Sequence, residues 1–229
     1  MPITTVVFDA YGTLFDVAAA ARECAAEPGR AAFAGKWQKI ASDWRLKQLQ
    51  YTWLRALADA HTDFWEVTQN GLDFALEASD LSGDPELRER LLALYWELSA
   101  YPEVPAMLAA LKADGLNTAI LSNGSPDMLN GAVQSAGVGD VLDDVLSVQD
   151  VGIFKPHKSV YDLVMKRFSC QPSEVLFVSS NCWDACAAAG NGFFTSWVNR
   201  AGEPMDRLPW QPQVTLSDLT TIPDIAKAN

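Results

Sequence analysis

The spacing of hydrophobic positions changes twice along the chain. Residues 3–9 form an apolar, β-branched run that ends in an aspartate, which predicts a buried strand. From about residue 16 to residue 98 the apolar positions recur at helical spacing, and no strand-like run interrupts them. After residue 101 strand-like and helix-like segments alternate. This alternation predicts an α/β fold in which a parallel sheet carries helices on both faces.

The long helical segment is expected to be an insert after the first strand. Residues 16–98 would form this insert, and residues 1–15 and 99–229 would together form the core. A later helix of the insert begins at Asp84, because a proline follows at the first helical position and an acid in the first turn. Two apolar stripes mark a long helix, one of Trp37, Ile40, Trp44 and Tyr51 and one of Leu46, Leu49, Trp53 and Leu57.

The alternating part of the chain has clear boundaries. Gly115 is placed to follow a helix as its C′ residue, and Ser125 with Pro126 is a typical helix start. Strands are expected at residues 116–121, 144–148, 175–178 and 193–198, and helices at about 103–114, from Pro126, at 158–168 and around Asp184.

Composition limits the possible partners. The 229 residues include 17 Lys+Arg and 29 Asp+Glu, which gives a net charge of −12, and 49% are hydrophobic. This composition is globular, and so acidic a chain is repelled by phosphate backbones, which disfavours nucleic acid as a partner. No apolar run approaches the about 20 residues that span a bilayer, and residues 1–9 lack the basic region of a signal peptide. We therefore expect no membrane partner and a cytoplasmic location.

The four cysteines, Cys24, Cys170, Cys182 and Cys186, follow neither a disulfide-framework spacing nor a zinc-site spacing. Cys182 and Cys186 would lie one helical turn apart, and buried free thiols are the expected state of this pair. Free thiols agree with a reducing cytoplasm.

Polar residues stand where the expected strands end. For any one of them a turn or cap role is the plain interpretation, but several strand ends that carry such residues together predict a binding site at that edge of the sheet. Only two histidines are present, so catalysis would depend on carboxylates, hydroxyls, amides and a few cations. The strand-end residues are Asp9, Ser122, Asn123, Ser179, Ser180 and Asn181, with Asp184 one turn further on and Lys155 in the intervening loop.

Four short motifs follow one another in order along the chain. They are Phe8–Phe15 (FDAYGTLF), Ser122–Gly124 (SNG), Lys155-Pro156 and Ser179–Asp184 (SSNCWD). This series resembles the haloacid dehalogenase superfamily and is most similar to its L-2-haloacid dehalogenases. Residues 44–53 (WRLKQLQYTW) also resemble the cap helix of that family. Over nearly the whole chain, the resemblance implies a Rossmann-like parallel sheet with a helical cap inserted after the first strand.

Most members of this superfamily are magnesium-dependent phosphatases, so the reaction depends on particular residues. Such phosphatases carry an acid two positions after the nucleophilic Asp, where this chain has Tyr11, and another early in the last motif, where it has Ser180. Magnesium prefers carboxylate oxygens, and only Asp9 and Asp184 remain at these motifs. Tyr11 could also be a turn residue packed on the insert. A phosphatase and a catalytically silent binding or scaffold protein stay as alternatives.

By the resemblance, the chain converts short (S)-2-haloalkanoic acids to (R)-2-hydroxy acids with inversion, and it needs no metal or cofactor. Asp9 attacks C2 and forms an ester, a step that needs no general acid because halide leaves without a proton. Lys155 would lower the pKa of Asp9, unless it is a solvated loop lysine. Ser122, Asn123 and backbone amides near Tyr11 would hold the substrate carboxylate.

Other residues receive roles from the same resemblance. Arg45 would accept the halide, although periodicity alone favours a solvated helix face for it. The expected homodimer, the small anionic substrate and the halide product are the partners that the family implies. Leu46 departs from the family pattern, where Gln is common, and could alter the polarity of the pocket, and Cys186–Ala188 also departs from it. The further candidates are Tyr11, Leu49, Phe64 and Trp183 for an apolar wall that could equally be core, Asp184, Asn181, Ser179 and Lys155 for orienting or activating water, and Thr13 and Tyr161 beside the nucleophile.

Overall fold

A parallel sheet forms the centre of the protein, whose computed structural model describes residues 2–229. Six strands lie in the order β3-β2-β1-β4-β5-β6, and every neighbouring pair is parallel. The chain moves outward from β1 to β2 on one side and to β4 on the other, so the strand order reverses at β1. The strands are β1 (Thr5–Phe8), β2 (Asn117–Ser122), β3 (Asp144–Ser147), β4 (Val175–Ser179), β5 (Phe194–Val198) and β6 (Val214–Leu216).

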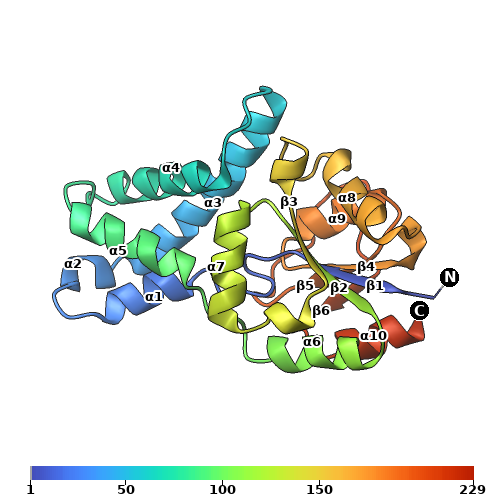
Figure 1. Cartoon of the computed structure of the whole chain (residues 1–229). Coiled ribbons are helices and arrows are strands. Elements are labelled where there is room, and N and C mark those ends of the chain that lie inside the picture. The colour runs from blue at the N-terminus through green and yellow to red at the C-terminus, as the bar shows by residue number, and fades with distance from the viewer. Residues whose placement is uncertain (1) are drawn as a thin grey trace.

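Helices cover both faces of this sheet, as the alternating pattern predicts. Figure 1 shows α6 and α10 together below the sheet and α8 and α9 above it. The inner strands β1 and β4 are buried along their whole length, which their apolar sequences require. The helices are α6 (Val104–Ala113), α7 (Pro126–Ala136), α8 (Lys158–Phe168), α9 (Cys182–Gly190) and α10 (Ile222–Ala228), with 3₁₀ turns at Gly139–Val141, Val148–Asp150 and Pro172–Glu174.

A helical cap is inserted after β1, as expected, and extends away from the sheet (Figure 1). In its longest helix, α3, Ile40 and Trp44 are buried, whereas Leu46 and Leu57 of the second stripe are exposed. Asp84 caps α5 by accepting a hydrogen bond from the Leu87 amide at 2.9 Å. No helix within residues 2–229 is long and apolar enough to cross a membrane. The cap consists of α1 (Ala19–Ala26), α2 (Ala31–Ala34), α3 (Trp37–Leu57), α4 (Phe64–Glu77) and α5 (Pro85–Trp96).

The sequence pattern misses the last two elements. β6 is a three-residue edge strand with one exposed and two half-buried side chains, too short to show alternation, and α10 is only seven residues long. Gly115 has the expected left-handed backbone after α6, with a φ of 76°. Ser125 does precede α7, but its side chain makes no capping hydrogen bond, so only its position was predicted correctly. Cys182 and Cys186 are buried free thiols, as expected, with their sulfurs 3.9 Å apart.

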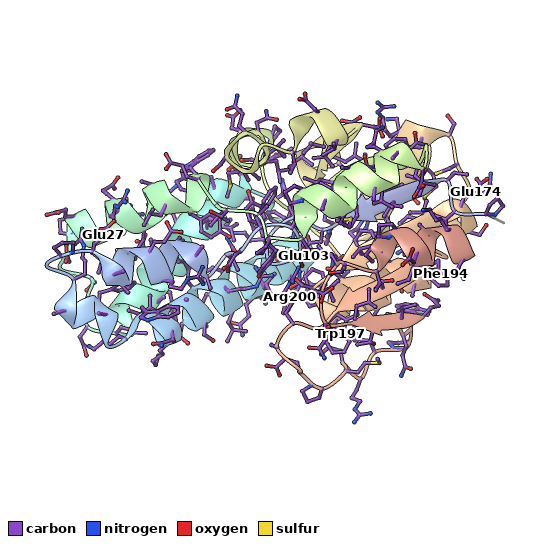
Figure 2. The ribbon with its side chains drawn as sticks, turned by 90° about the horizontal axis from the view of Figure 1, so that it is seen from below. Glu27, Glu103, Glu174, Phe194, Trp197 and Arg200 are labelled. Atoms are coloured by element: carbon purple, nitrogen blue, oxygen red, sulfur yellow. The ribbon has the colours of Figure 1, made fainter. Side chains whose placement is uncertain are left out.

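Two antiparallel segments connect the cap to the sheet. The Asp16 amide donates to the Ser99 carbonyl at 3.0 Å, and the Tyr101 amide donates to the Leu14 carbonyl at 2.9 Å. Arg200 braces this connection from the sheet side, because its guanidinium forms an ion pair with Glu103 at 2.7 Å and donates to the Thr13 carbonyl at 3.2 Å. Figure 2 shows Arg200 and Glu103 together where the cap meets the sheet. The cap is therefore anchored beside the end of β1.

Gly71 allows α4 to pack closely on α3. A Cβ atom at this position would lie 3.1 Å from the Trp44 carbonyl oxygen and 3.2 Å from the Gln48 amide nitrogen. We therefore expect Gly71→Val to lower the free energy of unfolding by about 1–3 kcal/mol, as overpacking does. Urea unfolding followed by circular dichroism measures this change. Gly35→Val is the matched control, since a Cβ there meets nothing within 4 Å; an equal loss in both variants would contradict the packing argument.

Candidate active site

The carboxyl ends of three neighbouring strands bring the site together. Asp9 follows β1, Ser122 ends β2 and Ser179 ends β4. The Asp9 amide donates to the Val178 carbonyl at 2.9 Å, so the β1–β4 ladder continues up to the carboxylate. This is the point where the strand order reverses, and in open α/β sheets such a crevice is where ligands bind.

A buried ion triad lies at the centre of the site. The Lys155 ammonium is 3.1 Å from Asp9 Oδ1 and 2.9 Å from Asp184 Oδ2. Lys155 and Asp184 are 1% and 0% exposed, so water screens these charges poorly. Burial alone would lower the pKa of Lys155, but the carboxylates of Asp184 and Asp9 outweigh it and raise this pKa. The lysine is therefore charged and belongs to the site, not to a solvated loop.

Asp184, the fully buried member of the triad, is held by further donors. Its Oδ1 accepts a hydrogen bond from the Tyr161 hydroxyl at 2.7 Å, and its Oδ2 accepts one from Ser179 at 3.1 Å. Burial raises the pKa of Asp184 and the Lys155 ammonium opposes that rise. Burial and the nearby Asp184 charge raise the pKa of Tyr161 well above its ordinary value. Tyr161 is thus a neutral donor that fixes the orientation of Asp184.

The second oxygen of Asp9 contacts two more predicted residues. Asp9 Oδ2 accepts a hydrogen bond from Asn181 Nδ2 at 3.1 Å and lies 3.1 Å from Thr13 Oγ1. Thr13 Oγ1 also accepts a hydrogen bond from the Ser180 amide at 2.7 Å. Together with Lys155, these donors fix the position of the Asp9 carboxylate.

Arg45 reaches from the cap into the sheet side of the site. Its Nη2 donates to the Tyr11 carbonyl at 3.0 Å and to Asn181 Oδ1 at 2.9 Å. Arg45 comes from α3, so these bonds join the cap to the loops after β1 and β4. The guanidinium therefore lies beside the Asp9 carboxylate's own partner Asn181, and not on a solvated helix face.

Ser122 and Asn123 form the wall beside β2. The Asn123 Oδ1 accepts a hydrogen bond from the Lys155 amide at 2.9 Å, which turns the Nδ2 group of Asn123 into the donor available to a ligand. The Ser122 Oγ accepts a hydrogen bond from the Gly124 amide at 3.1 Å. The Tyr11 ring lies over Gly124, where a Cβ would come within 2.8 Å of the ring.

Within the turn after Asp9, the Gly12 amide donates to the Phe15 carbonyl at 2.7 Å.

A small cavity of about 20 Å³ lies between these groups. Tyr11, Leu49, Phe64 and Trp183 supply its apolar wall. Thr13, Ser179, Tyr161 and Asp184 do not line it and act through other side chains. The remaining lining residues are Asp9, Arg45, Gln48, Ser122, Asn123, Lys155 and Asn181.

Gln48 is the lining residue that the sequence interpretation missed. It is 2% exposed, and its Nε2 donates to Thr68 Oγ1 at 2.7 Å and to the Tyr95 hydroxyl at 3.2 Å. Its position one turn after Trp44, on the buried stripe of α3, was the available signal. Leu46 is 49% exposed and does not line the cavity, so its departure from the family pattern leaves the polarity of the cavity unchanged.

Two observations bear on whether the site could carry out the phosphatase reaction. No group of three or more His, Cys, Asp or Glu side chains within residues 2–229 is placed to hold a metal ion. Tyr11 stands where phosphatases carry their acid, and burial raises its pKa well above its ordinary value, with Tyr95 and Asp9 adding to the effect. Such a phenol is a poor proton donor near neutral pH.

The sequence of this chain is similar to those of known dehalogenases. Residues 3–192 match the family described as haloacid dehalogenase-like hydrolase. The chain is 43% identical over 224 residues to (S)-2-haloacid dehalogenase 1 of Pseudomonas sp. (strain CBS-3), covering 98% of this chain and 96% of the relative. Haloacetate dehalogenase H-2 of Moraxella sp. (strain B) is 36% identical over 220 residues, covering 96% of each chain.

Solved structures are similar over the same length. The L-2-haloacid dehalogenase from Xanthobacter autotrophicus with chloropropionic acid covalently bound superposes with a TM-score of 0.88 at 35% identity. The superposition covers 97% of this chain and 98% of that structure. The sheet and the helical cap therefore both have counterparts there.

Replacing Lys155 should make stability depend on pH. In Lys155→Met the buried carboxylates of Asp9 and Asp184 lose their shared cation, a loss that costs about 3–5 kcal/mol in comparable sites. Protonation relieves this cost, so we expect the variant to be closer to the unchanged protein at about pH 5 than at about pH 8. The lysine itself stays charged throughout that range, because its pKa is raised.

Urea unfolding at the two pH values measures this difference. Lys158→Met is the matched control, since Lys158 is 70% exposed and pairs with Asp162 on the surface. Its effect should be below about 1 kcal/mol at both pH values. A loss in Lys155→Met that does not grow with pH would be incompatible with the buried triad.

Proposed function

The chain belongs to the haloacid dehalogenase-like hydrolase family, and we propose that it hydrolyses short (S)-2-haloalkanoic acids to (R)-2-hydroxy acids. The observation that carries the proposal is the buried Asp9, whose carboxylate three side-chain donors hold at the wall of a small cavity. A relative that is 43% identical to this chain is named (S)-2-haloacid dehalogenase 1. A carboxylate held in this way is a nucleophile that needs no further activation.

The first step forms an ester. An Asp9 oxygen attacks C2 of the substrate, the oxygen–C2 bond forms with inversion, and the halogen leaves as halide with the bonding electron pair. No proton is needed, which agrees with the neutral, high-pKa Tyr11 at the position of the phosphatase acid. Lys155 offsets the repulsion between Asp9 and the substrate carboxylate.

The substrate is held between two sets of donors. Ser122 and the Nδ2 group of Asn123 bind its carboxylate, and Arg45 on the cap side receives the leaving halide. Leu49 and Phe64 exclude water from the displacement. Arg45 is already fixed by Tyr11 and Asn181, so its charge is in place before the halide leaves.

The second step hydrolyses the ester. Water attacks the carbonyl carbon of Asp9 and gives one proton to Asp184, the bond from that carbon to the oxygen on C2 breaks, and Asp184 returns the proton to that oxygen as the 2-hydroxy acid leaves. The regenerated Asp9 carboxyl releases the remaining proton of the water to solvent. Asp184 accepts the proton, through the Ser179 hydroxyl or the Lys155 ammonium that contact its Oδ2. Burial raises the pKa of Asp184, which makes it a stronger base than an exposed carboxylate.

Two further proposals accompany the reaction. Residues 1–15, of which residue 1 lies outside the described part of the chain, and residues 99–229 form the catalytic core and residues 16–98 the cap, since the cap helices lie between the paired segments at Phe15 and Ala100. The protein acts in the cytoplasm on a small anion, with no nucleic acid or membrane as partner.

The protein also forms a homodimer, for which exposed Leu46 on α3 and Phe74 on α4 offer apolar surface.

Asp9→Asn should abolish turnover. The amide keeps the shape of the side chain but is no longer a nucleophile, so chloride release from (S)-2-chloropropanoate should fall by at least about a thousandfold. Asp140→Asn, at an exposed position, is the control and should retain activity. In the unchanged enzyme, release should proceed in EDTA. One turnover in heavy-oxygen water, with enzyme in excess, should place label in the Asp9 peptide; label found only in the hydroxy acid would refute the ester.

The dimer has its own test. Leu46→Asp places a charge in the proposed apolar interface and should shift the mass measured by sedimentation equilibrium from dimer toward monomer. Asp80→Asn, an exposed change on the loop after α4, should leave the mass unchanged. A monomeric unchanged protein would rule out the dimer without bearing on the chemistry.

A further inference from the structure

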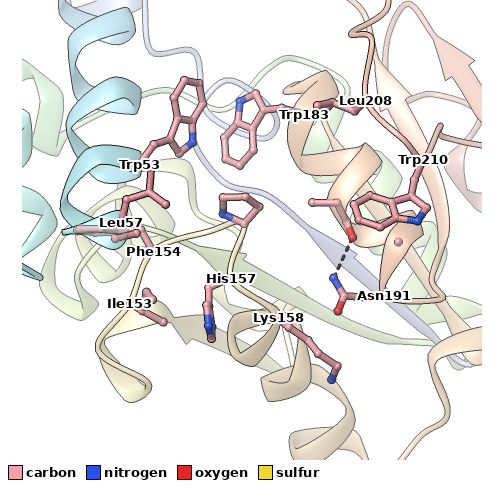
Figure 3. A pocket seen from close by; sticks show the side chains of 14 residues that line it. Trp53, Leu57, Ile153, Phe154, His157, Lys158, Trp183, Asn191, Leu208 and Trp210 are labelled. Atoms are coloured by element: carbon pink, nitrogen blue, oxygen red, sulfur yellow. Dashed lines mark hydrogen bonds between the residues drawn. The ribbon is translucent and has the colours of Figure 1, made fainter. Parts of the chain in front are cut away.

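A large apolar groove lies next to the catalytic cavity. Its volume is about 780 Å³, within the range of ligand sites, and it lies between the end of α3, the loop around Pro156 and α9. Figure 3 shows Trp53 and Trp183 together at one end of the groove and Trp210 at the other. Leu57 and Trp210, which line it, are 86% and 52% exposed. The reaction proposed above gives this groove no role.

The groove continues the catalytic cavity along one face of α3. Arg45, Leu49, Trp53 and Leu57 are spaced by four residues and therefore share a helix face. Arg45 and Leu49 line the catalytic cavity, whereas Trp53 and Leu57 line the groove. Trp183 lines both spaces. This face of α3 thus leads from the catalytic cavity to the groove.

Trp183 is the partition between the two spaces. Its indole Nε1 is buried with no hydrogen-bond partner among residues 2–229, and its ring meets Trp53 edge-on at 5.4 Å. Trp44 and Trp197, in contrast, donate from Nε1 to the Thr68 and Ser180 carbonyls. A buried indole N–H without a partner gains one by turning toward solvent, which would join the cavity to the groove.

The lining of the groove suits an apolar chain. None of its fourteen lining residues is Asp or Glu, and the one lysine among them, Lys158, is paired with Asp162. The far wall is fixed, because Trp210 packs on Gly190, where a Cβ would lie 2.5 Å from the indole. The groove is therefore preformed.

We propose that this groove binds the hydrocarbon tail of 2-haloacids too long for the catalytic cavity, and that Leu57 and Trp210 determine chain-length specificity. The proposal rests on the dehalogenase function proposed above. The carboxylate and C2 of a long substrate stay at Asp9, while carbons beyond Leu49 pass Trp183 into the groove. Each methylene that enters should tighten binding about fourfold.

Steady-state kinetics on the full chain test this subsite. The probes are (S)-2-bromopropanoate and (S)-2-bromooctanoate as substrates, with propanoate and octanoate as inhibitors and as ligands in titration calorimetry. The unchanged enzyme should bind octanoate at least about tenfold more tightly than propanoate, and octanoate should compete with 2-bromopropanoate. Leu57→Ser and the double variant with Trp210→Ser should raise KM for 2-bromooctanoate about tenfold, with kcat/KM for 2-bromopropanoate within about twofold.

Leu54→Ser is the matched control. It removes another exposed leucine of α3, three residues earlier, that does not line the groove. Equal effects of Leu54→Ser and Leu57→Ser, or equal affinities for octanoate and propanoate, would overturn the tail subsite while halide release from 2-bromopropanoate still supports the reaction. If no halide is released but octanoate binds through Leu57, the reaction fails and the groove stands as a site for apolar carboxylates.

Discussion

One buried ammonium group, that of Lys155, holds the site together. Asp9 and Asp184 end up in a nearly dry space because the hydrophobic strands before them must be buried. Two carboxylates so placed would repel each other, and neither could ionise cheaply without the cation between them. Lys155 thus joins the ends of β1 and β4 to the loop after β3 through charge. The same contact that makes burial tolerable also pairs Asp9 with a cation, so stability and reactivity depend on one interaction.

The cap completes a site that the sheet only begins. Arg45 brings a positive charge to the side of Asp9 opposite the sheet, and it is fixed by groups of the loops after β1 and β4. That placement depends on the buried face of α3, where Gln48 bonds to Thr68 and Tyr95 on the neighbouring helices. An acidic protein can in this way bind an anion, since over the about 8 Å that salt leaves unscreened only local charges matter.

The sequence predicts the parts of the site that interrupt a simple pattern. Asp9 and Ser122 stand out because polar residues end apolar runs, and the position of the strands then implies where they meet. Gln48 gives no such signal, since a polar residue on a helix is usually solvated, and its partners Thr68 and Tyr95 are 20 and 47 residues away. The sequence pattern misses β6 for a different reason, because a three-residue edge strand has too few positions for alternation to be recognised.

Across the catalytic cavity, the cap and the sheet side meet through side chains and not through the backbone. The segments that join cap and sheet are tied by backbone hydrogen bonds and by Arg200, so they resist separation. Across the cavity, Arg45 makes two hydrogen bonds to the sheet side, and aromatic rings of the two sides pack on each other. Exchanging such hydrogen bonds for water costs only about 0.5–1.5 kcal/mol each. A substrate anion that itself pairs with Arg45 recovers this cost, so entry needs only side-chain rearrangement while the cap stays anchored.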